Sequence, residues 1–180
     1  REGKNENEYC KAHDLSNAKI KVGYFSPDFS SHAVANLSAG LFELHSRNLF
    51  EIYGFSLRKT TEKDEMRERL IKGFDYFYEL DGLSVAAINE LVKKINIDIA
   101  IDLAGHTRSA RTEIFQGRLA PIQVNYLGYP GTMGSKAYDY IIGDKIIIPE
   151  DAKQFYSEKV VYLDRKSVVQ GKSVFACVDL

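Results

Sequence analysis

Two glycine-bearing loops carry the residues best suited to bind a ligand or to act on one. The first loop begins with Gly105 and His106 and follows an apolar stretch, residues 97–103, that is typical of a buried strand. The second loop, residues 128–134, follows a similar stretch at residues 122–127. In open α/β sheets, ligands bind in the crevice outside the carboxyl ends of the strands. The two loops therefore predict a ligand site at that edge of the sheet.

His32 and His106 have the widest chemical range in this sequence. An imidazole exchanges protons near neutral pH and donates hydrogen bonds to anions. His106 lies between Gly105 and Thr107, and these neighbours leave its ring exposed. His32 directly precedes a predicted helix, so it either serves a ligand or satisfies the polar start of that helix. Thr107 has the same two alternatives, ligand binding or helix capping.

The second loop offers backbone groups and hydroxyls. Gly128, Gly131 and Gly134 allow a ligand to approach the backbone closely, although a tight turn with positive φ would also explain each glycine. Tyr129 and Thr132 add hydroxyl groups within reach of a ligand. We therefore expect Tyr129, Gly131, Thr132 and Gly134 to bind substrate together with Thr107.

Three arginines closely follow His106 in the sequence, namely Arg108, Arg111 and Arg118, and the arginine fork suits phosphate and carboxylate groups. For Arg111 and Arg118 we favour a charged surface that needs no ligand. Asp102 ends the strand before His106, and we expect it to orient loop amides. The other two histidines, His13 and His45, lack such a setting and are expected to be structural or solvated.

The apolar pattern predicts alternating strands and helices, which gives a Rossmann-like α/β domain with a mostly parallel sheet. Strands are predicted at residues 21–25, 50–57, 76–80, 97–103, 122–127, 138–142 and 159–163. A helix is predicted after His32, with Val34, Leu37, Leu41 and Leu44 facing the core, and another after Thr61, with Met66 and Leu70 facing the core. A third helix is predicted after Ser84, with Val85, Ile88, Leu91, Val92 and Ile95 facing the core. A fourth is predicted near residues 111–116. The order of the strands stays open.

The composition narrows the class of protein. The chain has 180 residues, a net charge of −1 and 44% hydrophobic residues, which is ordinary for a globular domain and gives no field that would attract nucleic acid. We expect no membrane span, because no apolar run is long enough. No cluster of His, Cys, Asp and Glu has convincing metal spacing. Two cysteines near opposite ends favour a reducing compartment, so we expect a cytoplasmic protein and leave a nuclear location open.

The ends of the chain differ from its centre. Residues 1–19 are polar without a sustained period, which indicates a linker, and residues 20–163 hold the predicted domain. Residues 164–180 are expected to be a non-native tail, because residues 164–174 resemble a translated sequencing adapter. The chain begins with Arg1 rather than Met, so we interpret it as a fragment.

Five blocks of sequence, in this order, resemble the catalytic region of the O-GlcNAc transferase family, glycosyltransferase family 41, which includes the SPINDLY-type enzymes. They are SPDFSSH at residues 26–32, DLAGHT at 102–107, RLAPIQVNYLGYPGTMG at 118–134, DYII at 139–142 and FYSEKVVYL at 155–163. The resemblance implies the N-terminal, Rossmann-like lobe of a GT-B glycosyltransferase. It also implies that His32 and His106 act in catalysis, since both lie in these blocks.

The resemblance further implies transfer of N-acetylglucosamine from UDP-GlcNAc to Ser or Thr of proteins, with inversion and with neither metal nor cofactor. The expected partners are a nucleotide sugar, protein acceptors and the missing C-terminal catalytic lobe. We therefore expect this fragment alone to be inactive. Two alternatives stay open: a SPINDLY-type transferase using GDP-fucose, and a noncatalytic protein-binding module.

Overall fold

The computed structural model describes residues 19–60 and 63–163. Seven strands in these ranges form one sheet of order β3-β2-β1-β4-β5-β6-β7, and every neighbouring pair is parallel. The predicted linker, apart from its last residue, and the predicted tail lie outside the described residues. The strands are β1 (Ile20–Ser26), β2 (Phe50–Ser56), β3 (Tyr76–Glu79), β4 (Ile99–Asp102), β5 (Ile122–Tyr126), β6 (Tyr140–Gly143) and β7 (Lys159–Tyr162).

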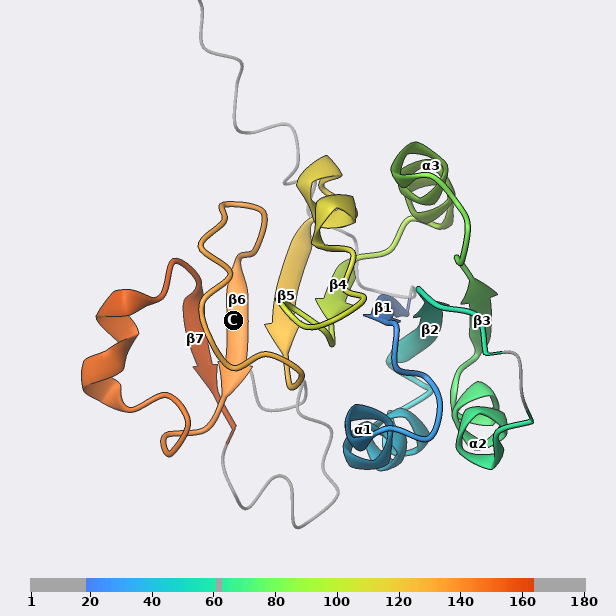
Figure 1. The fold of residues 1–180 in the computed structure, drawn as a ribbon, viewed down its shortest axis with the longest axis horizontal. Helices are drawn as coiled ribbons and strands as arrows, with labels where there is room; N and C mark the ends of the chain where they lie inside the picture. Colours follow the sequence, from blue (N-terminus) through green and yellow to red (C-terminus); the bar gives the residue numbers. More distant parts are fainter. Residues whose placement is uncertain (1–18, 61–62, 164–180) are drawn as a thin grey trace, which may run out of the picture.

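Helices cover both faces of the sheet (Figure 1). They are α1 (Ala33–Leu44), α2 (Glu65–Gly73), α3 (Val85–Ile95) and the 3-10 helices η2 (Thr112–Gly117) and η3 (Glu150–Phe155). One apolar cluster joins the sheet to α1 and α2, and a second joins it to α3 and η2. This arrangement confirms the predicted Rossmann-like α/β fold. None of the described helices is both long and apolar enough to cross a bilayer.

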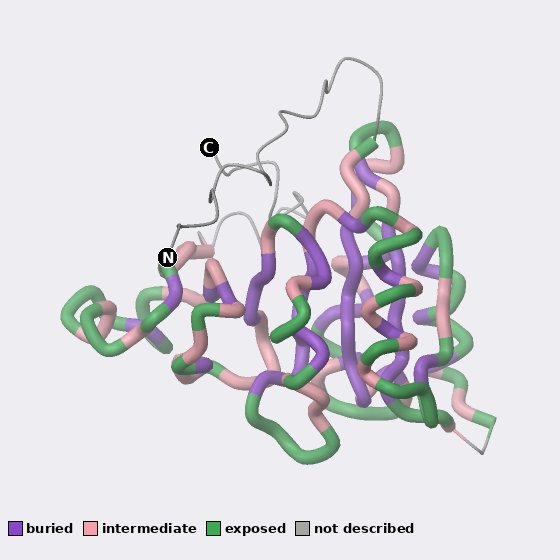
Figure 2. Tube along the Cα trace, turned by 90° about the horizontal axis from the view of Figure 1, so that it is seen from above, coloured by how far each residue is buried: buried purple, intermediate pink, exposed green. Residues whose placement is uncertain are grey.

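Alternating side chains of the central strands supply the two apolar layers. In β1, Val22 and Tyr24 pack toward α1 and α2, whereas Phe25 packs toward α3 and η2. In β2, Ile52 and Phe55 divide in the same way. Strands buried on both faces need apolar residues at consecutive positions. In Figure 2 these strands form the buried centre of the molecule, and exposed residues follow the helices and loops.

The predicted inner face of α1 is wrong for Leu37 and Leu44 and holds in part for Val34 and Leu41. The buried residues are Ala35, Ser38, Ala39 and Phe42, whereas Leu37 and Leu44 are 71% and 61% exposed. Small side chains bring the backbone of α1 close to the sheet, and Phe42 fills the remaining space against Tyr24 and Phe74, with ring centroids at 4.8 and 4.5 Å. Val34 and Leu41 lie at the border of this face and are half-buried. Close packing of small residues therefore outweighs the leucine spacing.

The predicted start of α2 also needs correction. Asp64 caps this helix, because its carboxylate accepts a hydrogen bond from the Arg67 amide at 2.8 Å. Thr61, the expected cap, lies outside the described residues. The predicted inward residues hold, since Leu70 is buried and Met66 is partly buried against the same cluster. In contrast, α3 begins after Ser84, as predicted. The Ser84 hydroxyl caps this helix by accepting a hydrogen bond from the Ala87 amide.

The strand order reverses direction next to β1. The chain places β2 and β3 on one side of β1 and then crosses to put β4 on the other side. The loops that leave the carboxyl ends of β1 and β4 therefore diverge at a topological switch point, the place where open α/β sheets bind ligands. The loop after β1 carries His32, and the loop after β4 carries His106. The fold thus puts both histidine-bearing loops at one edge of the sheet.

Candidate functional site

A groove of about 490 Å³ opens at this switch point. It is lined by the loops after β1, β2, β4 and β5 and by the first turn of α1. The groove contains two arginines and one histidine against a single carboxylate, so it favours anionic ligands. Its lining residues are Asp28, His32, Val34, Arg58, Thr107, Arg108, Ser109 and Gly128.

His32 combines the two roles that the sequence left open. It is the N-cap of α1, where its Nδ1 accepts from the Val34 amide at 3.3 Å, and it also lines the groove. The same Nδ1 lies 3.7 Å from Oδ2 of Asp28. These two contacts exclude each other, because Nδ1 accepts from an amide only without a proton and attracts a carboxylate only with one. The tautomer of His32 therefore depends on which contact is made.

His106 is exposed, as predicted, and it faces the second loop rather than the groove. Its Nε2 lies 3.2 Å from the carbonyl oxygen of Met133, and its ring meets Tyr129 edge-on at 5.3 Å. A carbonyl oxygen only accepts, so Nε2 must donate in this contact, which leaves Nδ1 to accept a proton. His106 and His32 thus lie on two sides of the switch point, and Thr107 and Arg108 line the groove next to His32.

Asp102 orients the loop that carries His106, as its position predicted. Its Oδ1 accepts from the amides of Ala104 at 2.9 Å and Gly105 at 3.0 Å, and its Oδ2 accepts from the hydroxyl of Tyr138 at 2.7 Å. Burial raises the pKa of the Asp102 carboxyl, and these hydrogen bonds oppose that rise. Gly105 has φ of +58°, a conformation that favours glycine. The buried carboxylate therefore fixes the turn immediately before His106.

A second buried carboxylate holds the loop after β5. Glu158 accepts from the Met133 amide at 2.7 Å and from the Thr132 hydroxyl at 2.8 Å. The Thr132 hydroxyl also accepts from the Gly134 amide at 3.1 Å. The structure therefore places Thr132 inside the support of the loop. Sequence reasoning missed Glu158, which precedes β7 and is brought to this loop only by the fold.

The glycines of this loop are required for different structural reasons. Gly134 has φ of +60°, so a turn with positive φ explains it. A Cβ atom at Gly128 would lie 2.1 Å from the carbonyl oxygen of Leu103, so close packing of two backbones explains that glycine. A Cβ atom at Gly131 would lie 2.8 Å from the Tyr129 ring. The Tyr129 ring thus lies between His106 and the Gly131 backbone.

Comparison with known proteins places the chain in a family. A sequence profile of Glycosyl transferase family 41 matches residues 2–176. The chain belongs to this family. It is 35% identical over 145 residues to the probable UDP-N-acetylglucosamine–peptide N-acetylglucosaminyltransferase SEC of Arabidopsis thaliana. It is 32% identical over 146 residues to the UDP-N-acetylglucosamine–peptide N-acetylglucosaminyltransferase of Caenorhabditis elegans.

These alignments cover most of the chain and a small part of its relatives. Each covers 81% of the chain, but only 15% of the Arabidopsis protein and 13% of the Caenorhabditis protein. A solved structure of a mutant O-GlcNAc transferase from Thermobaculum terrenum matches with a TM-score of 0.78 and 32% identity. That match covers 83% of this chain and 28% of the bacterial chain. The family 41 chain therefore corresponds to one lobe of a larger fold.

Two arginines of this family 41 chain are structural, in line with the interpretation favoured from sequence. Arg118 binds both carboxylate oxygens of Asp139, at 2.8 and 2.7 Å, and Arg111 donates to the Leu83 carbonyl at 3.0 Å. Arg58, in contrast, lines the groove although sequence reasoning missed it. It follows β2, so the rule that pointed to the other loops at the carboxyl edge would have found it.

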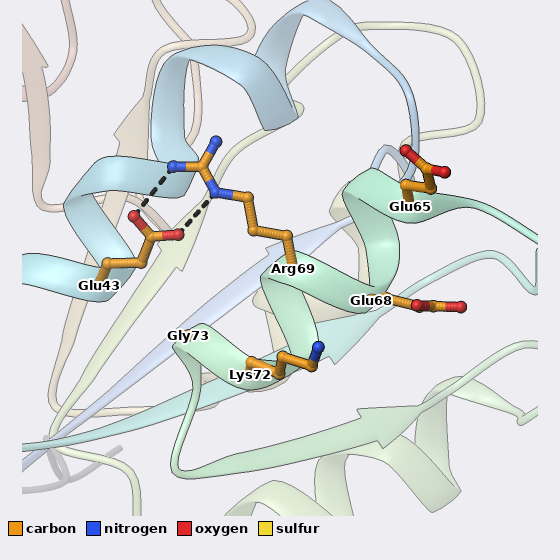
Figure 3. Close-up of a pocket in the computed structure, with 6 residues that line it drawn as sticks. All are labelled: Glu43, Glu65, Glu68, Arg69, Lys72 and Gly73. Carbon is orange, nitrogen blue, oxygen red and sulfur yellow. Dashed lines mark hydrogen bonds and ion pairs between the residues drawn. The ribbon is translucent and has the colours of Figure 1, made fainter.

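A second hollow, of about 270 Å³, lies between α1 and α2 and does not resemble a site. Figure 3 shows Arg69 of α2 reaching Glu43 of α1, with distances of 2.6 and 2.9 Å, while Glu65 and Lys72 line the hollow from α2. Its main feature is this surface ion pair, which holds two helices together. Across the described ranges, no group of three or more His, Cys, Asp or Glu side chains is arranged to hold a metal ion.

Proposed function

We propose that the chain forms the N-terminal lobe of the catalytic region of a protein O-linked N-acetylglucosaminyltransferase. The reaction proposed is inverting, metal-independent transfer of GlcNAc from UDP-GlcNAc to Ser or Thr of a protein. The observation that carries this proposal is the groove at the switch point, lined by His32, Thr107 and Arg108, in a family 41 chain. The names of its relatives support the choice of donor and acceptor.

Inverting transfer needs a group that removes the acceptor proton and groups that stabilise the leaving diphosphate. The two alternative contacts of His32 would allow it either to remove the acceptor proton or to stabilise the leaving diphosphate. When Nδ1 is protonated and faces Asp28, Nε2 is free to accept a proton as a base. When Nδ1 accepts from the Val34 amide, Nε2 carries the proton and donates to an anion. The tautomer thus selects between base and anion binder.

The remaining groups of the site fall into two roles under this proposal. Arg58 and Arg108 suit phosphate oxygens, since guanidinium groups bind them at charge-assisted distances. Thr107 and the loop with Tyr129 contact the sugar or the acceptor, together with the backbone at Gly131 and Gly134. Thr132 shapes that loop through Glu158. His106 serves as the second proton-handling group.

The test is sugar transfer by the full-length protein that contains this chain. UDP-GlcNAc and GDP-fucose are offered separately with a panel of Ser- and Thr-containing peptides, with and without a chelator, and the peptide mass and the anomeric configuration are measured. Transfer of GlcNAc with inversion in the presence of chelator is the expected result. His32→Ala is expected to lose transfer, whereas Glu90→Ala, an exposed change on α3, is the matched control.

GDP-fucose is the second donor because relatives with SPINDLY in their names also match, one from Arabidopsis thaliana at 30% identity. Transfer of fucose alone would replace GlcNAc in the proposal. Transfer of neither sugar would favour a noncatalytic module. The 180-residue chain alone is expected to transfer no sugar, because its groove is bounded by one lobe. Turnover by the chain alone at the rate of the full-length protein would contradict that expectation.

A further inference from the structure

The loop that presents His32 is tied to the start of α2, a helix distant in sequence. Oδ2 of Asp64 accepts from the Ser31 amide at 2.7 Å, and Oδ1 of the same carboxylate accepts from the Arg67 amide at 2.8 Å. One side chain therefore caps α2 and also holds the residue immediately before His32. The Ser31 amide and then the Arg67 amide lower the pKa of the Asp64 carboxyl.

Arg67 makes a second connection to the same loop from one turn further along α2. Its buried guanidinium donates to the Phe29 carbonyl at 2.7 Å and to the Ser56 hydroxyl at 3.3 Å. It also pairs with Glu79 and lies over the Phe77 ring at 5.1 Å. These contacts join the loop after β1 to the carboxyl ends of β2 and β3. A planar fork with five donors is suited to such a junction, and a single ammonium is not.

The helix that carries both residues is itself fixed. The Glu43–Arg69 ion pair of Figure 3 links α2 to α1, and Leu70 is buried in the apolar cluster that includes Phe29. The ring of Phe29 packs against Phe74 at 5.4 Å, so the loop is anchored through a side chain as well. The position of His32 therefore depends on α2 through two polar contacts to a rigid support.

We propose that Asp64 and Arg67 are positioning residues that hold His32 in place for sugar transfer. This inference rests on the proposed function, which gives His32 a part in the reaction. Neither residue lines the groove, and both act through the backbone of residues 29–31. A shift of a reacting group by about 1 Å lowers the reaction rate on the order of a hundredfold, because transfer requires the reacting atoms to be aligned and close together.

Conservative variants separate positioning from folding. Asp64→Asn keeps a good cap for α2, since Asn and Asp are equivalent N-caps. The Ser31 and Arg67 amides bind different oxygens of Asp64, so in Asn an NH2 group, which cannot accept, replaces one of these two acceptors. Arg67→Lys keeps the charge and loses the fork. Two controls match these changes. Ser84→Ala removes the cap of α3, and Lys72→Gln removes an exposed charge from the last turn of α2.

The experiment uses the full-length protein and measures kcat and KM for the nucleotide sugar, the unfolding temperature, and hydrogen exchange at the Ser31 amide. We expect Asp64→Asn and Arg67→Lys each to lower kcat by about ten- to a hundredfold with little change in KM. We expect Ser31 exchange to accelerate in Asp64→Asn. Ser84→Ala and Lys72→Gln should keep the wild-type kcat and the wild-type exchange at Ser31.

Three results would overturn the inference while leaving the proposed function intact. They are a wild-type kcat in both variants, unchanged Ser31 exchange in Asp64→Asn, and a loss of kcat that Ser84→Ala reproduces at an equal loss of unfolding temperature. An inactive wild-type protein with every donor would instead overturn the proposed function, and the role in transfer would fail with it. In that case Ser31 exchange would still report whether Asp64 holds the loop.

Discussion

Nε2 of His106 lies 3.2 Å from the carbonyl oxygen of Met133, and this contact joins the loop after β4 to the loop after β5. A buried carboxylate supports each side of the contact. Asp102 accepts from two amides just before His106, and Glu158 accepts from the Met133 amide. The imidazole is therefore exposed and yet held in a defined place between two fixed loops.

His106→Ala is expected to lower turnover more than stability. The side chain is exposed, so its truncation opens no core cavity, and the loss of one partly buried hydrogen bond costs about 0.5 to 1 kcal/mol. Loss of a proton-handling group costs on the order of a hundredfold in rate. Sugar transfer by the full-length protein and its urea unfolding midpoint are the two measurements. Normal turnover, or a rate loss matched by unfolding, would remove His106 from the reaction.

The control for that variant must not be His45. His45 is 4% exposed, and its Nε2 lies 2.7 Å from the Tyr24 hydroxyl, so its truncation disturbs the core. Glu90→Ala removes an exposed side chain from α3 and is the better reference. The expectation that His45 has a structural role is thus confirmed, and it makes this histidine a probe of stability instead.

Gly128→Ala and Gly40→Ala should have opposite effects on stability. A Cβ atom at Gly128 would lie 2.1 Å from the Leu103 carbonyl oxygen, a backbone atom that cannot rotate away. A Cβ atom at Gly40 would meet nothing within 4 Å, and alanine in the middle of α1 gains about 1 kcal/mol of helix propensity. Thermal unfolding of both variants is the measurement. A Gly128→Ala protein as stable as the wild type would show that the two loops are not in close contact.

The fold was largely predictable because the central strands are buried on both faces. Such strands appear in the sequence as continuous apolar runs. All seven strands were expected close to their observed bounds, including the edge strands β3 and β7, which are less buried. The inner face of α1 was not predictable in the same way. Ala35, Ser38 and Ala39 are weakly apolar, and their value is that they allow close approach to the sheet. A periodicity argument gives more weight to the larger Leu37, which is exposed.

One rule about parallel sheets was enough to predict the loops of the site, but not the residues that support them. The carboxyl ends of parallel strands share an edge, which pointed to His32, His106 and the glycine loop. The supports of these loops depend on contacts between distant segments. Asp64 and Ser31 are 33 positions apart, and Glu158 and Met133 are 25 apart. No local sequence pattern predicts such pairs. The two residues of each pair come together only when a helix or a crossover connection packs against the sheet.

Asp102→Asn should keep the loop before His106 in place, whereas Asp102→Ala should not. The amide oxygen of Asn still accepts from Ala104 and Gly105, and its NH2 group donates to the Tyr138 oxygen. The change also removes a buried charge. The folded-state pKa of this carboxyl is raised, so its contribution to stability is greatest in acid and is lost as pH rises.

The expected result at neutral pH is therefore an Asp102→Asn protein at least as stable as the wild type. Asp102→Ala should lose about 1 to 3 kcal/mol, because it leaves buried donors unsatisfied. Urea unfolding of both variants at neutral pH is the measurement. A large loss of stability in Asp102→Asn would show that the negative charge itself is needed, which would contradict the role assigned to the carboxylate as a hydrogen-bond acceptor.

His45 should make the fold sensitive to mild acid. Burial, followed by the nearby charge of Arg47, lowers the pKa of His45 from 6.5 to about 4, and Asp75 partly opposes this shift. The unfolded chain therefore binds more protons than the folded chain between these two values. Stability from this group is complete above about pH 6.5, falls as pH drops toward about 4, and changes no further below that. The total is on the order of 3 kcal/mol.

The measurement is urea unfolding from about pH 7 to about pH 4.5 for the wild type and for His45→Gln. Gln cannot take up a proton in this range, and its amide oxygen is able to accept from the Tyr24 hydroxyl. At neutral pH the variant is expected to be the less stable protein, because the imidazole also packs against Phe50 at 5.6 Å. As the pH falls, the difference should shrink, since only the wild type pays for protonating a buried ring. Parallel stability curves for the two proteins would show that His45 takes up its proton without disturbing the fold, and another group would then have to explain any acid sensitivity.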